Sequence, residues 1–401
     1  MKHLSLTLYL EINNTNFVFF VRSNDDQNNF KTIYELKTKL EGITNDRISD
    51  IDKISDVIKE NIYAIEKKLN YTFKEIIVIL ENFNPQFINF SGYKKLNGSQ
   101  ILRENITYIL NTLKSCVSDI ELKKTILHIF NSKYILDKKK IENLPIGLFG
   151  DFYSHELSFA LINYNDDKNL NLIINKCNLK LKKIFLKSFI KGTRLSDDYK
   201  NIDTFFYIQI KDNNSKIFYF ENDSLKFDQD FEFGWDIIIS DISKITSLKK
   251  ETVKHILNEI ELRKQISDNE KEELIGKEYF KSENYIKIKK KLIFEIMLAR
   301  VQEILEIMII KNTNLSYYNK NTKNIFLELE SEFKTKNIEE AFIHIFSTAN
   351  SMDLKLVKCI PSDEMLNTVN KLVHFGWKKE AIPVTHTKKT KIARFFDAIF
   401  S

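Results

Sequence analysis

Residues 4–21 read LSLTLYLEINNTNFVFFV, and residues 205–220 read FFYIQIKDNNSKIFYF. Each stretch holds two runs rich in apolar and aromatic residues around a short polar segment, at 13–15 in the first and at 211–214 in the second. Such runs separated by turn-forming residues predict a β-hairpin. The same architecture therefore recurs along the chain, which predicts two similar α/β halves rather than a short-period repeat.

Further elements follow each hairpin. Apolar residues recur at steps of three and four across 50–69 and predict an amphipathic helix that covers a sheet. The run IIVIL at 76–80 predicts the next strand. In the second half we expect a helix over 249–261, a long helix pair over roughly 281–311, a strand over 324–330 and helices over 337–347 and 362–374.

The segment after residue 87 changes character. Short strands and one helix near 101–115 lead to ILHIFNSKYILD at 126–137, then to a loop at 141–150 that keeps Pro and two Gly, and to a strand at 156–163. This order predicts a small, separate α+β insert within the first half.

Composition excludes several functional classes. The 401 residues include only 9 Gly and 4 Pro, so each remaining glycine is informative, and the net charge of +6 is spread along the chain. No nucleic-acid motif, hydrolase motif or metal-ligand spacing is present, and we expect no metal and no nucleic-acid partner. Three isolated cysteines, Cys116, Cys177 and Cys359, predict a reducing cytosol, and the N-terminus reads as a first strand rather than a signal peptide.

The last fourteen residues, KKTKIARFFDAIFS at 388–401, have the pattern of an amphipathic helix at a membrane surface. Basic residues near its start would meet anionic headgroups, while one face is apolar. A terminal helix that docks back onto the body is the alternative, and the preceding linker at 377–387 counts against it. The membrane-binding residues are predicted to be Lys388, Lys389, Lys391, Ile392, Arg394, Phe395, Phe396, Ile399 and Phe400.

The ordered features at 126–195 and the stretch IQIKDNNSKIFYFENDSLKFDQDFEFGWDIIISDIS at 208–243 carry a family resemblance. Together with the paired hairpins and the insert, they make nearly the whole chain resemble the FtsA family of actin-like cell-division proteins. The resemblance implies an actin-like (actin/Hsp70 ATPase-type) two-lobed α/β fold, with an FtsA-type IC (SHS2) insert in the first lobe.

The resemblance also implies a division of the chain into subdomains. We expect subdomain IA at 1–86, the IC insert at 87–166, a return to IA at 167–202, subdomain IIA at 203–260, subdomain IIB at 261–323, a return to IIA at 324–360, a return to IA at 361–376, the linker at 377–387 and the membrane helix at 388–401.

Actin-like ATP sites use glycine-rich turns, whose backbone amides approach the phosphates, and an acidic residue near Mg²⁺. Here the first turn keeps a carboxylate, as Glu11, and has Asn13 in place of the glycine, and asparagine tolerates a left-handed turn. The second turn loses its acid and its glycines. A tryptophan after Gly234 is expected to press toward the nucleobase. We expect no cofactor and a pseudo-ATPase, with ATP and Mg²⁺ bound only if the altered turns still function. The degenerate site comprises Glu11, Asn13, Asn14, Thr15, Gln209, Asp212, Asn213, Asn214, Gly234, Trp235, Leu329 and Glu330.

The helix KKKLIFEIMLARVQEILEIM at 289–308 resembles the IIB helix of the family. Arg300 and Glu303 match its partner-binding positions, and Arg300 is expected to clamp a carboxylate of the FtsZ C-terminal peptide. The resemblance implies a cytoplasmic adaptor at the inner face of the membrane that tethers FtsZ, recruits other divisome proteins through the insert and self-associates. An active actin-like ATPase and a PilM-like pilus scaffold are the alternatives.

Overall fold

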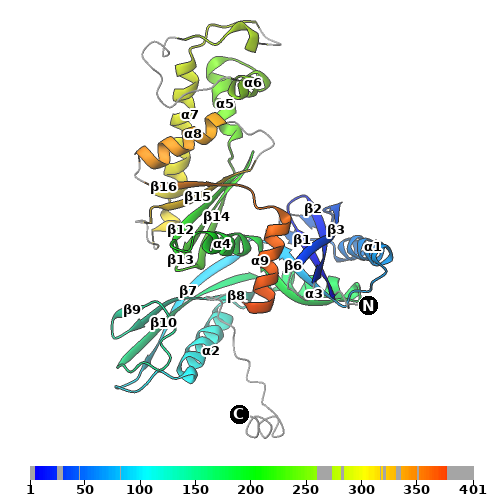
Figure 1. Cartoon of the computed structure of the whole chain (residues 1–401), viewed down its shortest axis with the longest axis vertical. Coiled ribbons are helices and arrows are strands. Elements are labelled where there is room, and N and C mark those ends of the chain that lie inside the picture. The colour runs from blue at the N-terminus through cyan, green and yellow to red at the C-terminus, as the bar shows by residue number, and fades with distance from the viewer. Residues whose placement is uncertain are drawn as a thin grey trace. The chain divides into compact units, whose positions relative to one another are not determined.

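The computed structural model describes residues 5–24, 30–44, 46–81, 83–259, 273–280, 284–316, 318, 322–330, 336–349 and 352–376. The chain divides into two compact units (Figure 1). We call residues 1–185 with 371–401 the first unit, and residues 186–370 the second unit. The predicted linker at 377–387 and the predicted membrane helix at 388–401 lie outside the described residues.

The first unit contains a five-stranded sheet in the order β11-β6-β1-β2-β3. β2 is antiparallel to both β1 and β3, whereas β1 and β6 are parallel. The predicted hairpin at 4–21 and strand at 76–80 are therefore confirmed, while β3 was not predicted. The strands are β1 (Ser5–Ile12), β2 (Asn16–Asn24), β3 (Phe30–Lys39), β6 (Glu75–Leu80) and β11 (Lys180–Leu186), and a small hairpin adds β4 (Ile43–Thr44) and β5 (Arg47–Ile48).

Helix α1 (Ile51–Leu69) confirms the predicted amphipathic helix at 50–69. Its Asp50 N-cap accepts a hydrogen bond from the amide of Lys53, and its end is marked by Asn70 in the left-handed conformation. The isoleucines at three- and four-residue steps are buried, and α1 packs beside α3 (Tyr164–Lys176). The spacing of apolar residues alone was enough to place this helix.

The second unit repeats the arrangement, with a sheet in the order β14-β13-β12-β15-β16. β13 is antiparallel to both β12 and β14, and β12 is parallel to β15. The predicted hairpin at 205–220 and the strand at 324–330 are confirmed. The strands are β12 (Phe205–Ile210), β13 (Ser215–Glu221), β14 (Ser224–Phe231), β15 (Asn324–Leu329) and β16 (Asp353–Val357).

One prediction about the helices of the second unit is wrong. Instead of a helix pair over 281–311, a single helix α7 (Lys290–Leu305) continues into a π-helical turn at Glu306–Ile310. The apolar residues of 292–309 satisfy one long buried helix, so no turn is needed between two. The other helices are α4 (Lys187–Asp198), α5 (Asp236–Thr246), α6 (Lys250–Glu259), α8 (Lys336–His344) and α9 (Ser362–Phe375).

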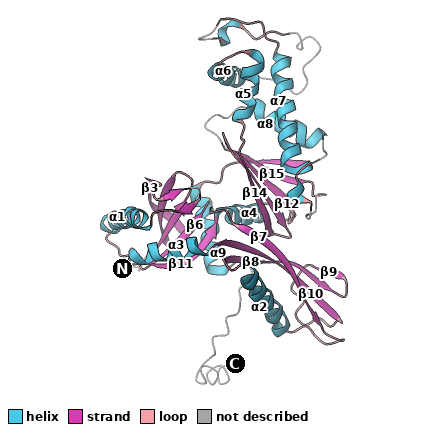
Figure 2. Cartoon of the chain, turned by 180° about the vertical axis from the view of Figure 1, so that it is seen from behind, coloured by secondary structure: helices cyan, strands magenta, loops and turns pink. Residues whose placement is uncertain are grey.

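A second sheet of the first unit lies between β6 and α3 in the chain, where the α+β insert was predicted. Its order is β7-β10-β8-β9, and α2 lies along it (Figure 2). Gly92 on β7 permits the close approach, because a Cβ there would lie 2.6 Å from Ile109 Cγ2. The elements are β7 (Gln86–Lys95), α2 (Arg103–Ile120), β8 (Lys124–Leu136), β9 (Lys139–Ile141) and β10 (Phe152–Asn163).

The two five-stranded sheets share one connectivity, in which the second strand of each is antiparallel to both neighbours and the first and fourth are parallel. This duplicated α/β arrangement is the predicted actin-like fold class. The units divide at 186 and 371. The predicted subdomain boundaries, including those at 203 and 361, stay predictions. None of the helices in the described ranges is long and apolar enough to cross a membrane.

Candidate functional site

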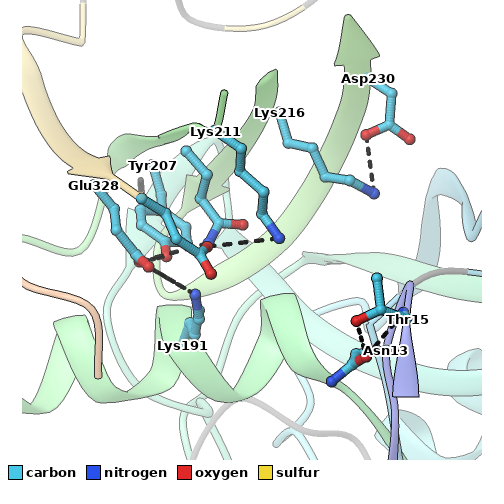
Figure 3. A network of polar contacts seen from close by, with 10 residues as sticks. Asn13, Thr15, Lys191, Tyr207, Lys211, Lys216, Asp230 and Glu328 are labelled. Carbon is cyan, nitrogen blue, oxygen red and sulfur yellow. Dashed lines mark hydrogen bonds and ion pairs between the residues drawn. The ribbon is translucent and has the colours of Figure 1, made fainter. Parts of the chain in front are cut away.

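The first hairpin turn belongs to the first unit, between β1 and β2. The side-chain oxygen of Asn13 accepts hydrogen bonds from the backbone amides of Thr15, at 3.0 Å, and Asn16, at 2.8 Å (Figure 3). Residues 13–15 are described and none has a positive φ, so the turn does not use the left-handed conformation that we considered for asparagine. Two amides that a glycine-rich phosphate loop leaves open are bound within the turn.

Glu11, the carboxylate predicted beside this turn, lies on β1 and is buried. It pairs in register with Val18 of β2 on one side and with Ile79 of β6 on the other. The central position in the sheet places the residue among strands rather than on the turn. The turn residues 13–15 and this carboxylate are therefore close in sequence, but the carboxylate lies within the sheet and the turn residues lie beyond the end of β1.

The second turn, at 211–214, joins β12 to β13 and is held by the start of α5. The backbone amides of Trp235 and Asp236 donate to the carbonyl oxygens of Lys211, at 3.2 Å, and Asp212, at 3.0 Å. Gly234 makes this contact possible, because a Cβ there would lie 2.1 Å from the Lys211 oxygen. Amides that precede a helix, which favour anions, are here occupied by carbonyls of the same unit.

The predicted pair Leu329 and Glu330 joins this group at the end of β15. The Glu330 amide donates to the Ile210 carbonyl oxygen at 2.9 Å. The Lys211 ammonium lies 3.5 Å from a Glu330 carboxylate oxygen. The structure therefore brings together the predicted residues of the second unit, at 211–214, 234–235 and 329–330, and links them by bonds among themselves.

The interpretation of Trp235 is wrong in one respect. We expected its side chain to press toward a nucleobase, but it is 2% exposed and packs in the core of the second unit with Ile238 and Ile239. A large apolar ring is stabilised more by burial than by an exposed position. Trp235 thus contributes to the packing of α5 against its sheet.

A buried polar network below the second turn was not predicted. The Glu328 carboxylate on β15 accepts from the Lys191 ammonium of α4, at 3.0 and 3.2 Å, and from the Tyr207 hydroxyl (Figure 3). Gln209, whose amide nitrogen lies 3.5 Å away, completes the group. The side chains of Lys191 and Glu328 are 5% and 1% exposed, so each charge depends on the other.

The network changes the pKa of two neighbouring groups, Tyr207 and Cys359. Burial, followed by the negative charge of Glu328, raises the pKa of the Tyr207 hydroxyl well above its ordinary value. Burial and the same carboxylate raise the pKa of the Cys359 thiol. Tyr207 and Cys359 therefore stay protonated at neutral pH and act as donors. The sequence signal was the presence of Gln209 and Glu328 within otherwise apolar strands.

A cavity of about 430 Å³ opens beside the network in the second unit. Tyr207, Glu328 and Cys359 line it, and Arg194 bonds to Asp198 at 2.8 Å and to Glu364 at 3.2 Å. Most of its charged groups are thus already paired within the protein.

The edge strand β14 carries another titrating group. Asp228 is half-buried and lies in register with Phe218, two residues from Asp230, which pairs with Lys216 at 2.9 Å. Burial raises the pKa of Asp228 to about 7, while the Lys216 ammonium acts in the opposite direction. The carboxyl therefore changes its charge near neutral pH.

The predicted partner residues of α7 are engaged within the second unit. The Arg300 guanidinium donates to one Asp241 oxygen of α5 through Nε and Nη2, both at 2.5 Å, and to Glu303 through Nη1 at 2.5 Å. Arg300 thus links α5 to α7 rather than presenting an open clamp. The predicted membrane residues at 388–401 lie outside the described part of the chain.

No family model matches this chain. It is similar to the cell division protein FtsA of Buchnera aphidicola subsp. Acyrthosiphon pisum (strain APS), with 23% identity over 256 residues that cover 64% of this chain and 60% of the relative. It is also similar to FtsA of Rhizobium meliloti (strain 1021), with 22% identity over 161 residues, 40% of this chain and 36% of that relative. The chain thus matches at most about three fifths of these relatives' length.

Two solved structures cover most of the chain at low identity. A PilM-PilN type IV pilus biogenesis complex has a TM-score of 0.48 at 8% identity and covers 92% of this chain and 98% of its own. MreB 5 of Spiroplasma citri bound to AMPPNP has a TM-score of 0.41 at 10% identity and covers 92% and 95%.

Sequence similarity to FtsA proteins of several bacteria and the duplicated topology lead to one assignment. The predicted resemblance and the predicted fold class are both confirmed. The chain is similar in sequence to FtsA cell-division proteins, and its duplicated topology is of the actin-like fold class.

Proposed function

We propose that this protein is a nucleotide-independent adaptor of cell division, which tethers FtsZ filaments to the inner face of the membrane, recruits later division proteins and self-associates. The FtsA name of its relatives supports the division role. The state of its two hairpin turns supports independence from nucleotide.

The observation that carries this proposal is that backbone amides at both turns already donate hydrogen bonds to acceptors within the protein. The amides of Thr15 and Asn16 bond to Asn13, and those of Trp235 and Asp236 bond to the turn at 211–214. Phosphate binding would require these bonds to break, and each neutral hydrogen bond contributes about 1 kcal/mol. The residues present therefore fit ATP and Mg²⁺ poorly.

Lys191 supports the same proposal. Gln209 stands where the resemblance implies an acid, and the nearest carboxylate, Glu328, is neutralised by the Lys191 ammonium at 3.0 Å. A buried carboxylate that already accepts an ammonium and a hydroxyl has little capacity left for the water shell of a divalent cation.

Calorimetric titration with ATP and Mg²⁺ tests this proposal. We expect no saturable heat at millimolar ATP for the natural chain. The variant Asn13→Gly/Asp212→Gly, which restores glycine at both turns, is the matched comparison. Saturable binding by the natural chain would contradict the proposal and return the protein to the active ATPase alternative.

For FtsZ we propose a contact on α5 and α7, where an acidic peptide would take Arg300 away from its internal partners. Lys287 and Lys289 are exposed just before the start of α7 and increase the positive charge of that segment. The carboxylate of Asp241 then competes with the peptide for Arg300. A substitution of Asp241 and a substitution of Arg300 should therefore have opposite effects on peptide binding.

We therefore expect Asp241→Asn to strengthen binding of an FtsZ C-terminal peptide several-fold, and Arg300→Glu to weaken it at least tenfold, by fluorescence anisotropy. Both substitutions break the link between α5 and α7, so equal losses in the two variants would indicate damage to the helices and would argue against this contact.

For membrane attachment we propose the segment 388–401, on its sequence pattern alone. The full chain should bind vesicles that contain anionic lipid, and Phe396→Asp/Phe400→Asp should reduce the bound fraction strongly in cosedimentation. Undiminished binding would remove the tail from the proposal.

A further inference from the structure

The end of the insert carries a group of exposed apolar side chains for which the proposed function names no contact. We define the insert tip as residues 93–102 and 137–152. Phe149 is 69% exposed and Leu148 is 48% exposed, although both lie among well-ordered hydrogen bonds. The exposed large apolar side chains of the tip are Tyr93, Leu102, Leu144, Ile146, Leu148, Phe149 and Phe152.

Backbone hydrogen bonds lock the two chain segments of the tip together. The Ile101 amide donates to the Leu148 carbonyl oxygen at 2.8 Å, and the Gly147 amide donates to the Ile101 carbonyl oxygen at 2.9 Å. Asp137 adds a third anchor, since its carboxylate accepts from the amides of Asp151 and Phe152 at 2.9 and 2.8 Å. The exposed side chains are therefore held outward by a rigid frame.

Glycines make this frame possible. Gly98 and Gly147 have φ values of +79° and +90°, which side chains rarely adopt. A Cβ at Gly150 would lie 2.5 Å from Leu136 Cδ1. In a chain with only nine glycines, three are placed where they shape this tip.

The tip is far from the sheet that holds the rest of the first unit. β10 runs from Phe152 in the tip to Asn163, which caps α3. A strand of this length spans roughly 40 Å. Apolar side chains at the end of such an extension can reach a surface that the body of the unit does not touch.

Charge distinguishes the kind of surface. The tip contains five lysines and three acidic residues, a net charge of +2. Lys95, Lys138 and Lys139 are exposed, and Lys94 lies 4.9 Å from the ring centroid of Tyr108. Lysines beside exposed aromatic and aliphatic side chains suit an anionic lipid surface, where headgroups meet the ammonium groups and acyl chains meet the apolar groups.

We propose that the insert tip is a lipid-binding surface, which places Leu148 and Phe149 among the acyl chains of an anionic membrane. This contact goes beyond the proposed function, because it requires neither FtsZ nor the segment 388–401. It gives the protein a second point of attachment, and two weak points on one chain strengthen each other through their effective concentration.

Fluorescence quenching in the full chain tests the proposal directly. Phe149→Trp should lose about half of its added emission when vesicles of phosphatidylglycerol and phosphatidylcholine carry brominated acyl chains. Tyr63→Trp, at an exposed position of α1 in the same unit, is the matched control, and its emission should not be quenched. An unquenched Phe149→Trp on vesicle-bound protein would overturn the proposal.

Binding measurements supply the second arm. We expect Leu148→Asp/Phe149→Asp to weaken vesicle binding about tenfold, and Lys95→Glu/Lys139→Glu to weaken it only when anionic lipid is present. Both pairs are exposed, so thermal unfolding should be unchanged. Unaltered vesicle binding by Leu148→Asp/Phe149→Asp would overturn the proposal, as would loss of a self-associated species in sedimentation without lipid, which would assign the tip to a second copy.

The failures of the two membrane proposals are distinguishable. Phe396→Asp/Phe400→Asp tests the segment 388–401 and leaves the tip intact, whereas Leu148→Asp/Phe149→Asp does the reverse. In the chain that carries all four substitutions, we expect binding to anionic vesicles to fall to the level at which the natural chain binds neutral vesicles.

Discussion

The two hairpin turns have the same place in the duplicated sheets, yet different bonds hold them. In the first turn the Asn13 side chain accepts two amides from within four residues, and the Leu40 amide, just after β3, donates to the Thr15 carbonyl oxygen at 2.8 Å. The second is held from outside by the amides that begin α5, across Gly234. The first turn therefore combines bonds to its own side chain with one bond to a neighbouring segment, whereas the second depends on the close approach of a helix that only a glycine at 234 permits.

The difference extends below the turns. The second unit has a buried ion pair between Lys191 and Glu328. Removing one partner of a buried pair leaves an uncompensated charge, which costs more than the pair contributed. We therefore expect the second unit to be the more sensitive of the two to single substitutions.

Lys191→Met should have the largest effect. We expect the free energy of unfolding of the second unit to fall by about 3–5 kcal/mol, because Glu328 loses its ammonium. Urea denaturation followed by tryptophan fluorescence measures it, in a chain whose other tryptophan, Trp377, is replaced by Phe. The double variant Lys191→Met/Glu328→Gln should recover most of the loss, and a fully stable Lys191→Met would contradict the importance of the pair.

Gly234→Ala should come next, with a loss of about 3 kcal/mol, because its Cβ overlaps the carbonyl oxygens of Lys211 and Asp212. The same denaturation experiment measures this effect. Asn13→Gly, at the other turn, serves as the comparison and should cost less. Equal losses would remove the distinction between the two turns.

Asp228→Asn should change how stability depends on pH. The pKa of Asp228 is about 7 in the folded chain and 3.8 in its ordinary state, so the folded state holds the proton more tightly between these values. Stability from this group therefore falls as pH rises from about 4 to 7. We expect the variant to be about 2 kcal/mol more stable than the natural chain at pH 8, and equal melting temperatures at that pH would contradict this expectation.

Asn13→Ala should have the smallest effect, about 1 kcal/mol, because only hydrogen bonds at an exposed turn are lost. Hydrogen exchange gives the more sensitive measurement. The amides of Thr15 and Asn16 should exchange faster, while those of the second turn keep their rates. Unchanged exchange at Thr15 would show that Asn13 does not close the turn.

Periodicity explains why much of the fold could be predicted. In the two hairpins apolar residues recur at steps of two, which fits a strand, and in α1 they recur at steps of three and four, which fits a helix. The edge strands β3, β14 and β16 were missed because edge strands carry charged side chains, such as Lys37 and Lys355, which weaken the strand pattern. The false helix pair came from α7, which is apolar on most sides because it is buried.

The part of the candidate site that lies at strand ends could also be predicted from local sequence patterns. Positions in turns 211–214 and 329–330 follow directly from strand ends, and parallel strands bring their ends together. The direction of the Trp235 side chain and the engagement of Arg300 by Asp241 depend on a partner element far away in the sequence. No spacing within one segment contains that information.

The sequence by itself determined the duplicated hairpins, the insert and the altered glycine positions, because periodicity and turn chemistry are local. Only the tertiary structure decided that Lys191 neutralises Glu328, 137 residues later in the chain. It likewise decided that three glycines hold Leu148 and Phe149 outward. These outcomes depend on which backbones approach each other closely, and that is set by packing between elements rather than by any one of them.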